Sequence, residues 1–261
     1  MVDRGTGVPI VLIPGLQGRW EWMRPTVEAL ARQHRVITFS LCDEPTSGFS
    51  CDPKRGFENY IEQVGTALDR AGVKQAVILG VSYGGLIAAE FAARQPQRVT
   101  GLVLASPLHR TWQPDRLQAM YLRAPRLMSP LFVITAPLRL RPEMAAALPA
   151  AADRVKFFVR HTWRAVASPT TPLRMARRIA WARSHQFGNA RVAKPVLIVT
   201  GEQALDRVLP VKVSRRYLED ADSARHVVMA HTGHLGSVTR PDEFAGMVRS
   251  FVETDGLRLS A

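Results

Sequence analysis

The chain carries a serine in a setting that can turn a hydroxyl group into a nucleophile. Ser82 lies at the centre of residues 80–84, Gly-Val-Ser-Tyr-Gly, between an apolar run typical of a strand and a pattern typical of a helix. A serine at the tip of such a turn has a strained backbone, so the positions two before and two after it must be small. Its hydroxyl then stands at a helix N-terminus, where the helix dipole favours developing negative charge. The segment predicts Ser82 as a nucleophile for acyl transfer; the alternative is a glycine-rich turn with an incidental serine.

A serine hydroxyl attacks a carbonyl carbon only when a histidine takes its proton and an acid orients that histidine. Of the seven histidines, His231 and His234 follow the last strand-like segment of the chain. Gly233 comes directly before His234 and lets that loop turn back over the serine. We therefore predict His234 as the general base and keep His231 as the alternative.

The acid is expected between the serine and the histidine, after a strand. Asp206 lies beyond the strand-like residues 196–200 and just before the next helix-like segment. Glu202 is a rival because it is closer to the strand end, and Asp115 is a rival if the acid follows an earlier strand. Asp206 is the predicted acid, although an exposed loop aspartate with no role would look the same.

The tetrahedral intermediate of acyl transfer also needs two backbone N–H groups at its oxyanion. One is expected from Tyr83, directly after the nucleophile. The other is expected from the loop of residues 14–18, Pro-Gly-Leu-Gln-Gly, whose glycines let the backbone approach a substrate closely. Leu16 is the predicted donor in this loop, with Gln17 as the second choice.

The elements around these residues alternate between strand and helix. Apolar, β-branched runs indicate strands, and apolar residues at helical spacing indicate helices. This alternation is typical of a mostly parallel sheet covered by helices on both faces. The predicted strands are residues 8–13, 35–41, 75–79, 99–105, 195–200 and 224–230, and the predicted helices are residues 24–32, 57–71, 83–94, 211–218 and 242–253.

The alternation stops between residues 107 and 193. This segment is punctuated by prolines, rich in arginine and methionine, and looks helical without any strand of the main sheet. The organisation predicted is a core domain of residues 1–106 and 194–261, with a helical cap of residues 107–193 inserted in it. Some apolar residues of the cap are expected to line a substrate pocket, and the others to pack inside the cap: Trp112, Met120, Leu127, Met128, Leu131, Phe132, Phe157, Phe158 and Trp163.

Composition excludes several classes of protein. The 261 residues are 46% hydrophobic and 22% charged, as in an ordinary globular domain, and no apolar run is long enough to span a bilayer. Residues 1–9 do not resemble a signal peptide, so a cytoplasmic location is the default expectation. The net charge of +13 comes from scattered arginines, which favours a solvated basic surface over specific nucleic-acid binding. Two cysteines, expected to be free thiols, provide no metal framework, and no cofactor is expected.

Together these segments resemble the α/β-hydrolase superfamily over most of the chain outside the cap. Residues 14–16 stand where the family usually has His-Gly-x, so Leu16 inherits the oxyanion role by position, with Pro14 replacing the usual histidine. Residues 80–85 are similar to the nucleophile motif, and residues 233–234 to the histidine loop. Residues 201–210 resemble the acid loop, with two extra residues between Gly201 and Asp206.

The resemblance also implies an architecture. The chain starts almost directly at what is the third strand of the full family sheet, so about six strands are expected. The strand at residues 35–41 would then form an uncovered edge, and an uncovered edge invites pairing with a second chain. A homodimer through this edge is therefore a prediction.

The resemblance implies a class of reactions as well. The first interpretation is a carboxylesterase that takes small to medium hydrophobic esters as substrates. Carbon–carbon bond hydrolases, lactonases, aminopeptidases and cofactor-free haloperoxidases share these motifs. Members that use an aspartate nucleophile are disfavoured by Ser82. A non-catalytic ligand-binding member of the fold is the alternative from a different class.

Overall fold

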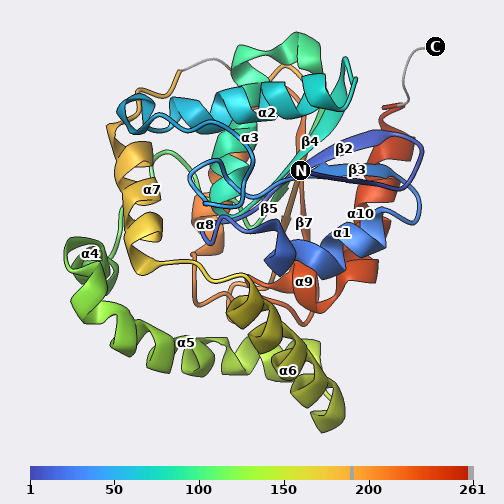
Figure 1. Ribbon diagram of the computed structural model, residues 1–261. Helices are drawn as coiled ribbons and strands as arrows, with labels where there is room; N and C mark the ends of the chain where they lie inside the picture. The colour runs from blue at the N-terminus through green and yellow to red at the C-terminus, as the bar shows by residue number, and fades with distance from the viewer. Residues whose placement is uncertain (189–190, 258–261) are drawn as a thin grey trace.

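The computed structural model describes residues 1–188 and 191–257, and its centre is a seven-stranded sheet. The strands follow the order β1-β3-β2-β4-β5-β6-β7, and every pair is parallel except β1 with β3. The mostly parallel sheet expected from the alternating pattern is confirmed (Figure 1). Its strands are β1 (Val2–Arg4), β2 (Pro9–Ile13), β3 (Arg35–Thr38), β4 (Ala76–Val81), β5 (Val99–Ala105), β6 (Val196–Thr200) and β7 (Ala224–Val228).

The edge of the sheet differs from the prediction. The strand at β3 was expected to be uncovered in a sheet of about six strands, and this is wrong because β1 pairs antiparallel with it, Val2 opposite Thr38. An ion pair of Asp3 with Arg35 reinforces the pairing. The turn back to β2 uses Gly5, at φ 78°, where a Cβ would lie 2.2 Å from the His34 carbonyl oxygen. The short, polar β1 resembles a loop in sequence, and the dimer prediction loses its original premise.

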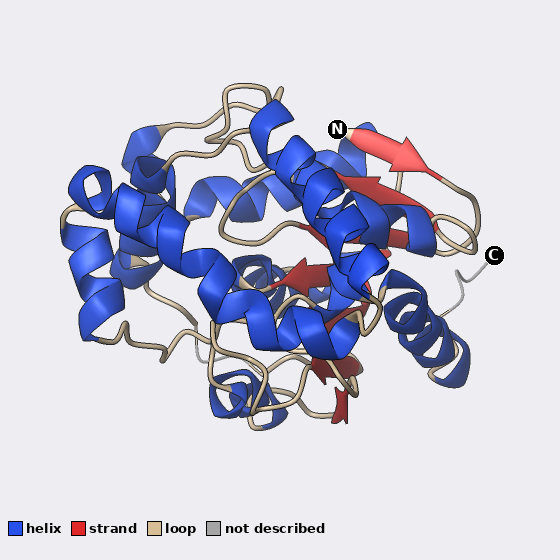
Figure 2. Ribbon diagram, turned by 90° about the horizontal axis from the view of Figure 1, so that it is seen from below, coloured by secondary structure: helices blue, strands red, loops and turns tan. Residues whose placement is uncertain are grey.

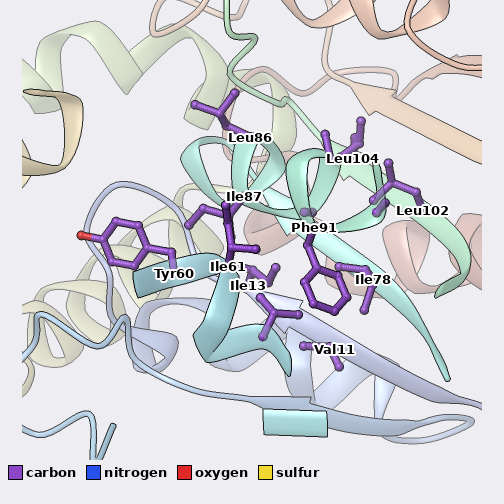
Figure 3. Packing of buried hydrophobic residues seen from close by; sticks show 14 of the residues in the cluster. Val11, Ile13, Tyr60, Ile61, Ile78, Leu86, Ile87, Phe91, Leu102 and Leu104 are labelled. Carbon is purple, nitrogen blue, oxygen red and sulfur yellow. The ribbon is translucent and has the colours of Figure 1, made fainter. Parts of the chain in front are cut away.

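One face of the sheet is covered by α2 (Glu58–Arg70) and α3 (Tyr83–Arg94). Side chains alternate along each strand, so Val11 and Ile13 of β2 and Ile78 of β4 all point to this face. Figure 3 shows them packed against Phe91 and Ile87 of α3. This packing fixes α3, and therefore the turn at its N-terminus, relative to the strands.

The opposite face is covered by α1 (Arg24–Leu30) and α10 (Pro241–Thr254). Ile10 and Leu12 of β2, with Leu79 of β4, pack on this side against the buried Phe244 and the rest of the α10 core face. The smaller elements on the two faces are η1 (Trp20–Met23), η2 (Pro53–Arg55), η3 (Pro96–Arg98), α8 (Val211–Ser214), η4 (Arg215–Leu218) and α9 (Gly236–Thr239).

Four helices lie between β5 and β6, in the segment predicted to be a cap. They are α4 (Arg116–Arg123), α5 (Pro125–Ala147), α6 (Ala151–Ala167) and α7 (Pro172–Ser184), called here the cap helices. In Figure 1, α7 runs beside the core, whereas α5 and α6 form the lower edge of the molecule. None of the helices in the described ranges is long and apolar enough to cross a membrane. The exact division into core and cap, the cellular location and the oligomeric state stay predictions.

Candidate active site

Ser82 occupies a sharp turn between β4 and α3. Its backbone has φ 54° and ψ −115°, a strained conformation for a residue with a side chain. A Cβ on Gly80 would lie 2.3 Å from the Gly84 carbonyl oxygen, and a Cβ on Gly84 would lie 2.4 Å from that of Ile13. Both flanking glycines are therefore required by contact, as the sequence predicted.

The structure brings together the three side chains that the sequence singled out for proton transfer. The hydroxyl oxygen of Ser82 lies 3.0 Å from Nε2 of His234, and Nδ1 of His234 lies 3.2 Å from Oδ2 of Asp206. They come from three separate turns that follow β4, β6 and β7. Because parallel strands end at the same edge of the sheet, residues 152 positions apart in sequence become neighbours.

Asp206 is held in place by the loop that carries it. Its Oδ1 accepts hydrogen bonds from the backbone N–H groups of Val208, at 3.0 Å, and Leu209, at 2.9 Å, which leaves Oδ2 for the imidazole. Gly201 and Gly233 let the acid loop and the histidine loop touch, because a Cβ on Gly201 would lie 2.4 Å from the Gly233 carbonyl oxygen. The two extra residues in this loop do not prevent the contact.

The rival candidates lie elsewhere. Glu202 accepts a hydrogen bond from the backbone N–H of His231 at 2.6 Å, so it ties the histidine loop to β6 rather than orienting an imidazole. His231 itself is exposed. Asp115 caps α4, where its carboxylate accepts from the N–H of Gln118 at 2.7 Å. Of the rivals, none contacts His234 through the hydrogen bonds that the structure describes.

The electrostatics of the pair favour a charged acid and a more basic histidine. Burial alone lowers the pKa of His234, but the Asp206 carboxylate outweighs it, and the pKa of His234 lies above its ordinary value. Burial alone raises the pKa of Asp206, but His234 and the two backbone N–H donors outweigh it, and the pKa of Asp206 is lowered. The imidazole is therefore a stronger base than a free histidine.

The two predicted oxyanion donors flank the serine. Tyr83 is the first residue of α3, directly after Ser82. The loop containing Leu16 lies against the serine, since a Cβ on Gly15 would come 3.5 Å from Cβ of Ser82. The loop of residues 15–18 therefore lies directly beside the serine.

A buried arginine of the cap helices contacts both Leu16 and Tyr83, the two residues predicted as oxyanion donors. Arg178 of α7 is fully buried, and its Nη1 donates to the carbonyl oxygen of Leu16 at 2.7 Å. The backbone carbonyl of Arg178 in turn accepts a hydrogen bond from the phenol of Tyr83 at 2.9 Å. The side chain also fills the space above Gly18, where a Cβ would lie 2.4 Å from the guanidinium.

The charge of Arg178 is compensated by two buried carboxylates. Nε and Nη2 of Arg178 donate to Oδ1 of Asp43 at 3.0 and 2.9 Å, and Nη2 also donates to Glu44. Burial alone lowers the pKa of Arg178, but these carboxylates raise it above its ordinary value, so the guanidinium stays charged. Arg174 and Arg177 pair with the same acids, at 2.5 Å to Glu44 and 3.1 Å to Asp43.

A second buried group from the cap helices lies under the histidine loop. Glu143 of α5 is fully buried, and its Oε1 accepts a hydrogen bond from the backbone N–H of Leu235 at 2.6 Å. Its Oε2 packs against Gly233, since a Cβ added to that glycine would lie 2.8 Å from this oxygen. Burial raises the pKa of Glu143. The carboxyl therefore ties α5 to the residues on either side of His234.

Neither Arg178 nor Glu143 was singled out from the sequence. Arg178 is one of four arginines in α7, and Glu143 follows a proline in an apolar helix, so neither has a pattern that separates it from surface charge. Their roles depend on which loop the cap helices contact, and this information is absent from local spacing.

A cavity of about 190 Å³ lies between α3 and α7. Its wall includes Leu86 and Leu108, and the N–H of Leu108 donates to the Ser82 carbonyl oxygen at 2.9 Å. Its wall also includes Trp112, together with polar side chains of His109, Arg110, Gln113, Arg183 and His185, and none of the three residues predicted for the triad is part of it.

The other apolar cap residues named for the pocket mostly do not line it. Phe157 packs against the core, whereas several are exposed to solvent: Met120, Leu127, Leu131, Phe158 and Trp163. The side chain of Phe132 lies outside the described residues. Within the part of the chain that the structure describes, no group of three or more His, Cys, Asp or Glu side chains could hold a metal ion.

The chain is similar to proteins of a known family. Residues 8–241 match the family model described as alpha/beta hydrolase fold. The chain is 25% identical over 256 residues to a protein named as a carbamate hydrolase, RutD, of Rhizobium rhizogenes, and the alignment covers 96% of this chain and 95% of the relative. It is 27% identical over 256 residues to the pimeloyl-(acyl-carrier protein) methyl ester esterase of Aliivibrio salmonicida, covering 96% of this chain and 94% of the relative.

Solved structures show the same fold. The crystal structure of the enol-lactonase from Burkholderia xenovorans LB400 matches with a TM-score of 0.76 and 21% sequence identity, covering 97% of this chain and 95% of the other. At this identity the likeness concerns the fold alone.

Proposed function

Because this chain belongs to the alpha/beta hydrolase fold family, we propose that it is a serine hydrolase that cleaves carboxylic esters with Ser82, His234 and Asp206 as its catalytic triad. The single observation that carries the proposal is the continuous chain of contacts from the Ser82 hydroxyl through both ring nitrogens of His234 to the buried Asp206. A binding protein has no need for this alignment, in which each group faces the partner that its chemistry requires.

The reaction follows from the contacts. Ser82 Oγ attacks the acyl carbon while its proton passes to Nε2 of His234, and the carbonyl oxygen takes the electron pair of its double bond. The N–H groups of Leu16 and Tyr83 stabilise this oxyanion. When the double bond reforms, the carbon–oxygen bond to the alcohol breaks, and the imidazolium gives its proton to the departing oxygen.

Water completes the cycle by a second addition and elimination, in which water is the nucleophile and Ser82 Oγ is the leaving group. His234 takes a proton from a water molecule, whose oxygen attacks the acyl-serine. The acyl–Ser82 bond then breaks, and the imidazolium returns the proton to Oγ, which releases the carboxylic acid. Throughout, Asp206 stays ionised and stabilises the imidazolium, in keeping with its lowered pKa.

The substrate class proposed is small to medium hydrophobic esters. The relative named as a methyl ester esterase supports ester chemistry over carbon–carbon bond cleavage. A p-nitrophenyl ester series of increasing acyl length, run beside simple lactones, ranks these possibilities directly.

The decisive test is covalent labelling. A fluorophosphonate probe should label the wild-type protein and fail to label Ser82→Ala, and only the wild type should turn over p-nitrophenyl butyrate. The melting temperature of both proteins shows that the variant is folded. Folded wild-type protein that neither takes the probe nor hydrolyses the ester would refute the proposal.

A further inference from the structure

Helix α6 carries apolar side chains on two opposite faces, and the core covers only one of them. Phe157 and His161 face inward, with their rings stacked at a centroid distance of 5.4 Å. His161 also meets Trp22 of η1 edge-on, at 5.2 Å. A helix on the surface of a globular protein normally turns polar residues to the solvent on its other face. The outer face of α6 does not follow this rule.

The outer face of α6 is an apolar stripe, made of Val155, Phe158, Val159, Trp163 and Val166. Each of these side chains is between 59% and 72% exposed. At the helical rotation of about 100° per residue they occupy an arc roughly 140° wide, opposite the inward-facing rings. An apolar surface of this kind marks an interaction site, because water disfavours its exposure.

The neighbouring helix α5 has a similar face. Leu127, Leu131 and Leu138 are 79%, 43% and 64% exposed, and their spacing places them on one side of the helix. Both helices form the lower edge of the molecule in Figure 1 and lie toward the viewer in Figure 2. The exposed apolar residues therefore belong to two cap helices that lie along one edge of the molecule.

The segment that contains the stripe is strongly basic. Residues 107–193 contain 15 Lys and Arg but only three Asp and Glu, so they carry 12 of the 13 net positive charges of the chain. Lys156 and Arg160 border the stripe along the side of Trp163. Within the described part of the chain, five of the 15 cations form ion pairs with carboxylates outside this segment: Arg110, Arg174, Arg177, Arg178 and Arg191.

We propose that the outer face of α6 docks on the surface of an anionic lipid bilayer. The helix lies in the plane of the interface, with the stripe among the upper acyl chains and with Lys156 and Arg160 at the lipid phosphates. Aromatic and aliphatic residues on one face beside cations are the composition that such interfacial helices use. This inference goes beyond the proposed ester hydrolysis and does not depend on it.

Two other occupants fit the same surface less well. A second copy of the chain would bring two basic cap segments together, and like charges at an interface are unfavourable. Nucleic acid would satisfy the cations through its phosphates, but this attraction makes no use of a row of exposed Val, Phe and Trp side chains. A lipid surface satisfies both the charge and the apolar stripe.

Vesicle sedimentation tests the proposal with the full chain. The wild-type protein should sediment with vesicles of equimolar phosphatidylcholine and phosphatidylglycerol, and not with phosphatidylcholine alone. Trp163→Ser should lower the partition coefficient about tenfold. Lys156→Gln should lower it about fivefold. Val228→Ser, which removes an apolar side chain that is 46% exposed on β7, and Lys74→Gln on the core are the matched controls, and neither should change it.

Tryptophan emission supplies a second measurement. Transfer of Trp163 into the interface should shift the emission to shorter wavelength when mixed vesicles are added, and Trp163→Phe should keep the binding but lose this shift. The emission shift then reports insertion of the indole ring of Trp163. Adhesion of the protein to the vesicles by charge alone would not insert this ring.

Three results would overturn the proposal. The first is no binding to the mixed vesicles. The second is binding that Trp163→Ser leaves unchanged, because attraction by charge alone would then explain it. The third is a dimer, detected by light scattering, that Trp163→Ser dissociates, which would assign the stripe to self-association. Loss of ester hydrolysis with retained vesicle binding would refute only the proposed function.

Discussion

The buried guanidinium of Arg178 offers the sharpest test of how the cap helices serve the active site. It joins three elements: α7, which carries it, the loop containing Leu16, and the two acids Asp43 and Glu44. Arg178→Met keeps most of the apolar stem but removes the charge and the hydrogen bond to the Leu16 carbonyl. We predict a loss of both stability and rate.

The size of the stability loss follows from what the variant leaves behind. Removing one partner of a buried ion pair costs about 3–5 kcal/mol, chiefly because the other charge stays buried without compensation. Here Glu44 keeps Arg174 and Asp43 keeps Arg177, so the loss should lie near the lower end, about 3 kcal/mol. In a domain of this size that corresponds to a melting temperature about 6–12 °C lower.

The rate should fall through a displaced oxyanion donor. Without Arg178 the loop of residues 15–18 is no longer held from its carbonyl side, so the N–H of Leu16 loses its alignment. We expect kcat for p-nitrophenyl butyrate to fall about 10-fold to 100-fold in folded protein, less than the loss from deleting an oxyanion donor outright. Calorimetry gives the melting temperature, and titration with a fluorophosphonate probe corrects kcat for the fraction of competent protein.

Control variants separate the loss of the ion pairs from the loss of loop position as explanations of the Arg178→Met effects. Arg183→Met changes an exposed cation on the same helix and should leave the melting temperature within about 1 °C of the wild type. Adding Asp43→Asn to Arg178→Met should recover part of the lost stability, because it removes a buried charge that has lost its main partner and keeps only Arg177. An unchanged melting temperature in Arg178→Met would refute the ion-pair reasoning, and an unchanged kcat with lowered stability would refute the positioning of the loop.

Three further predictions concern the triad and its turn. Asp206→Asn should lower kcat about 10⁴-fold, whereas Glu202→Gln should cost less than about tenfold; the reverse order in steady-state assays would reassign the acid. Because the pKa of His234 is raised and its neutral form is the base, kcat/KM should rise with pH through a midpoint above 6.5, and a midpoint below 6.5 in a pH-rate profile would contradict this. Gly80→Ala places a Cβ 2.3 Å from a carbonyl oxygen of α3 and should destabilise the protein by about 1–3 kcal/mol in thermal unfolding, whereas Gly246→Ala, with open space around it, should not destabilise it.

Local patterns were sufficient for most of the sheet and for the residues that the structure brings together at Ser82. Strand residues buried on both faces are continuously apolar, so β2, β4, β5 and β6 could be predicted from the sequence. The contact of Ser82, His234 and Asp206 could be expected because each of them follows a strand in a fixed chain order, and glycines mark the turns that need them. The strand β1 was missed because it lies at an edge and consists of three residues, of which Asp3 and Arg4 are polar.

What the sequence by itself determined is the sharp turn at Ser82 and the strands that carry it, because both depend on residues close together in the chain. The tertiary structure decided which charges become internal. Arg178 and Glu143 are indistinguishable in sequence from the solvated charges around them, yet they are buried against the oxyanion loop and the histidine loop. The apolar face of α6 is the converse case, because its residues look like cap core in the sequence and lie at the surface in the fold. Burial depends on which distant elements a helix meets, and only the folded chain contains that information.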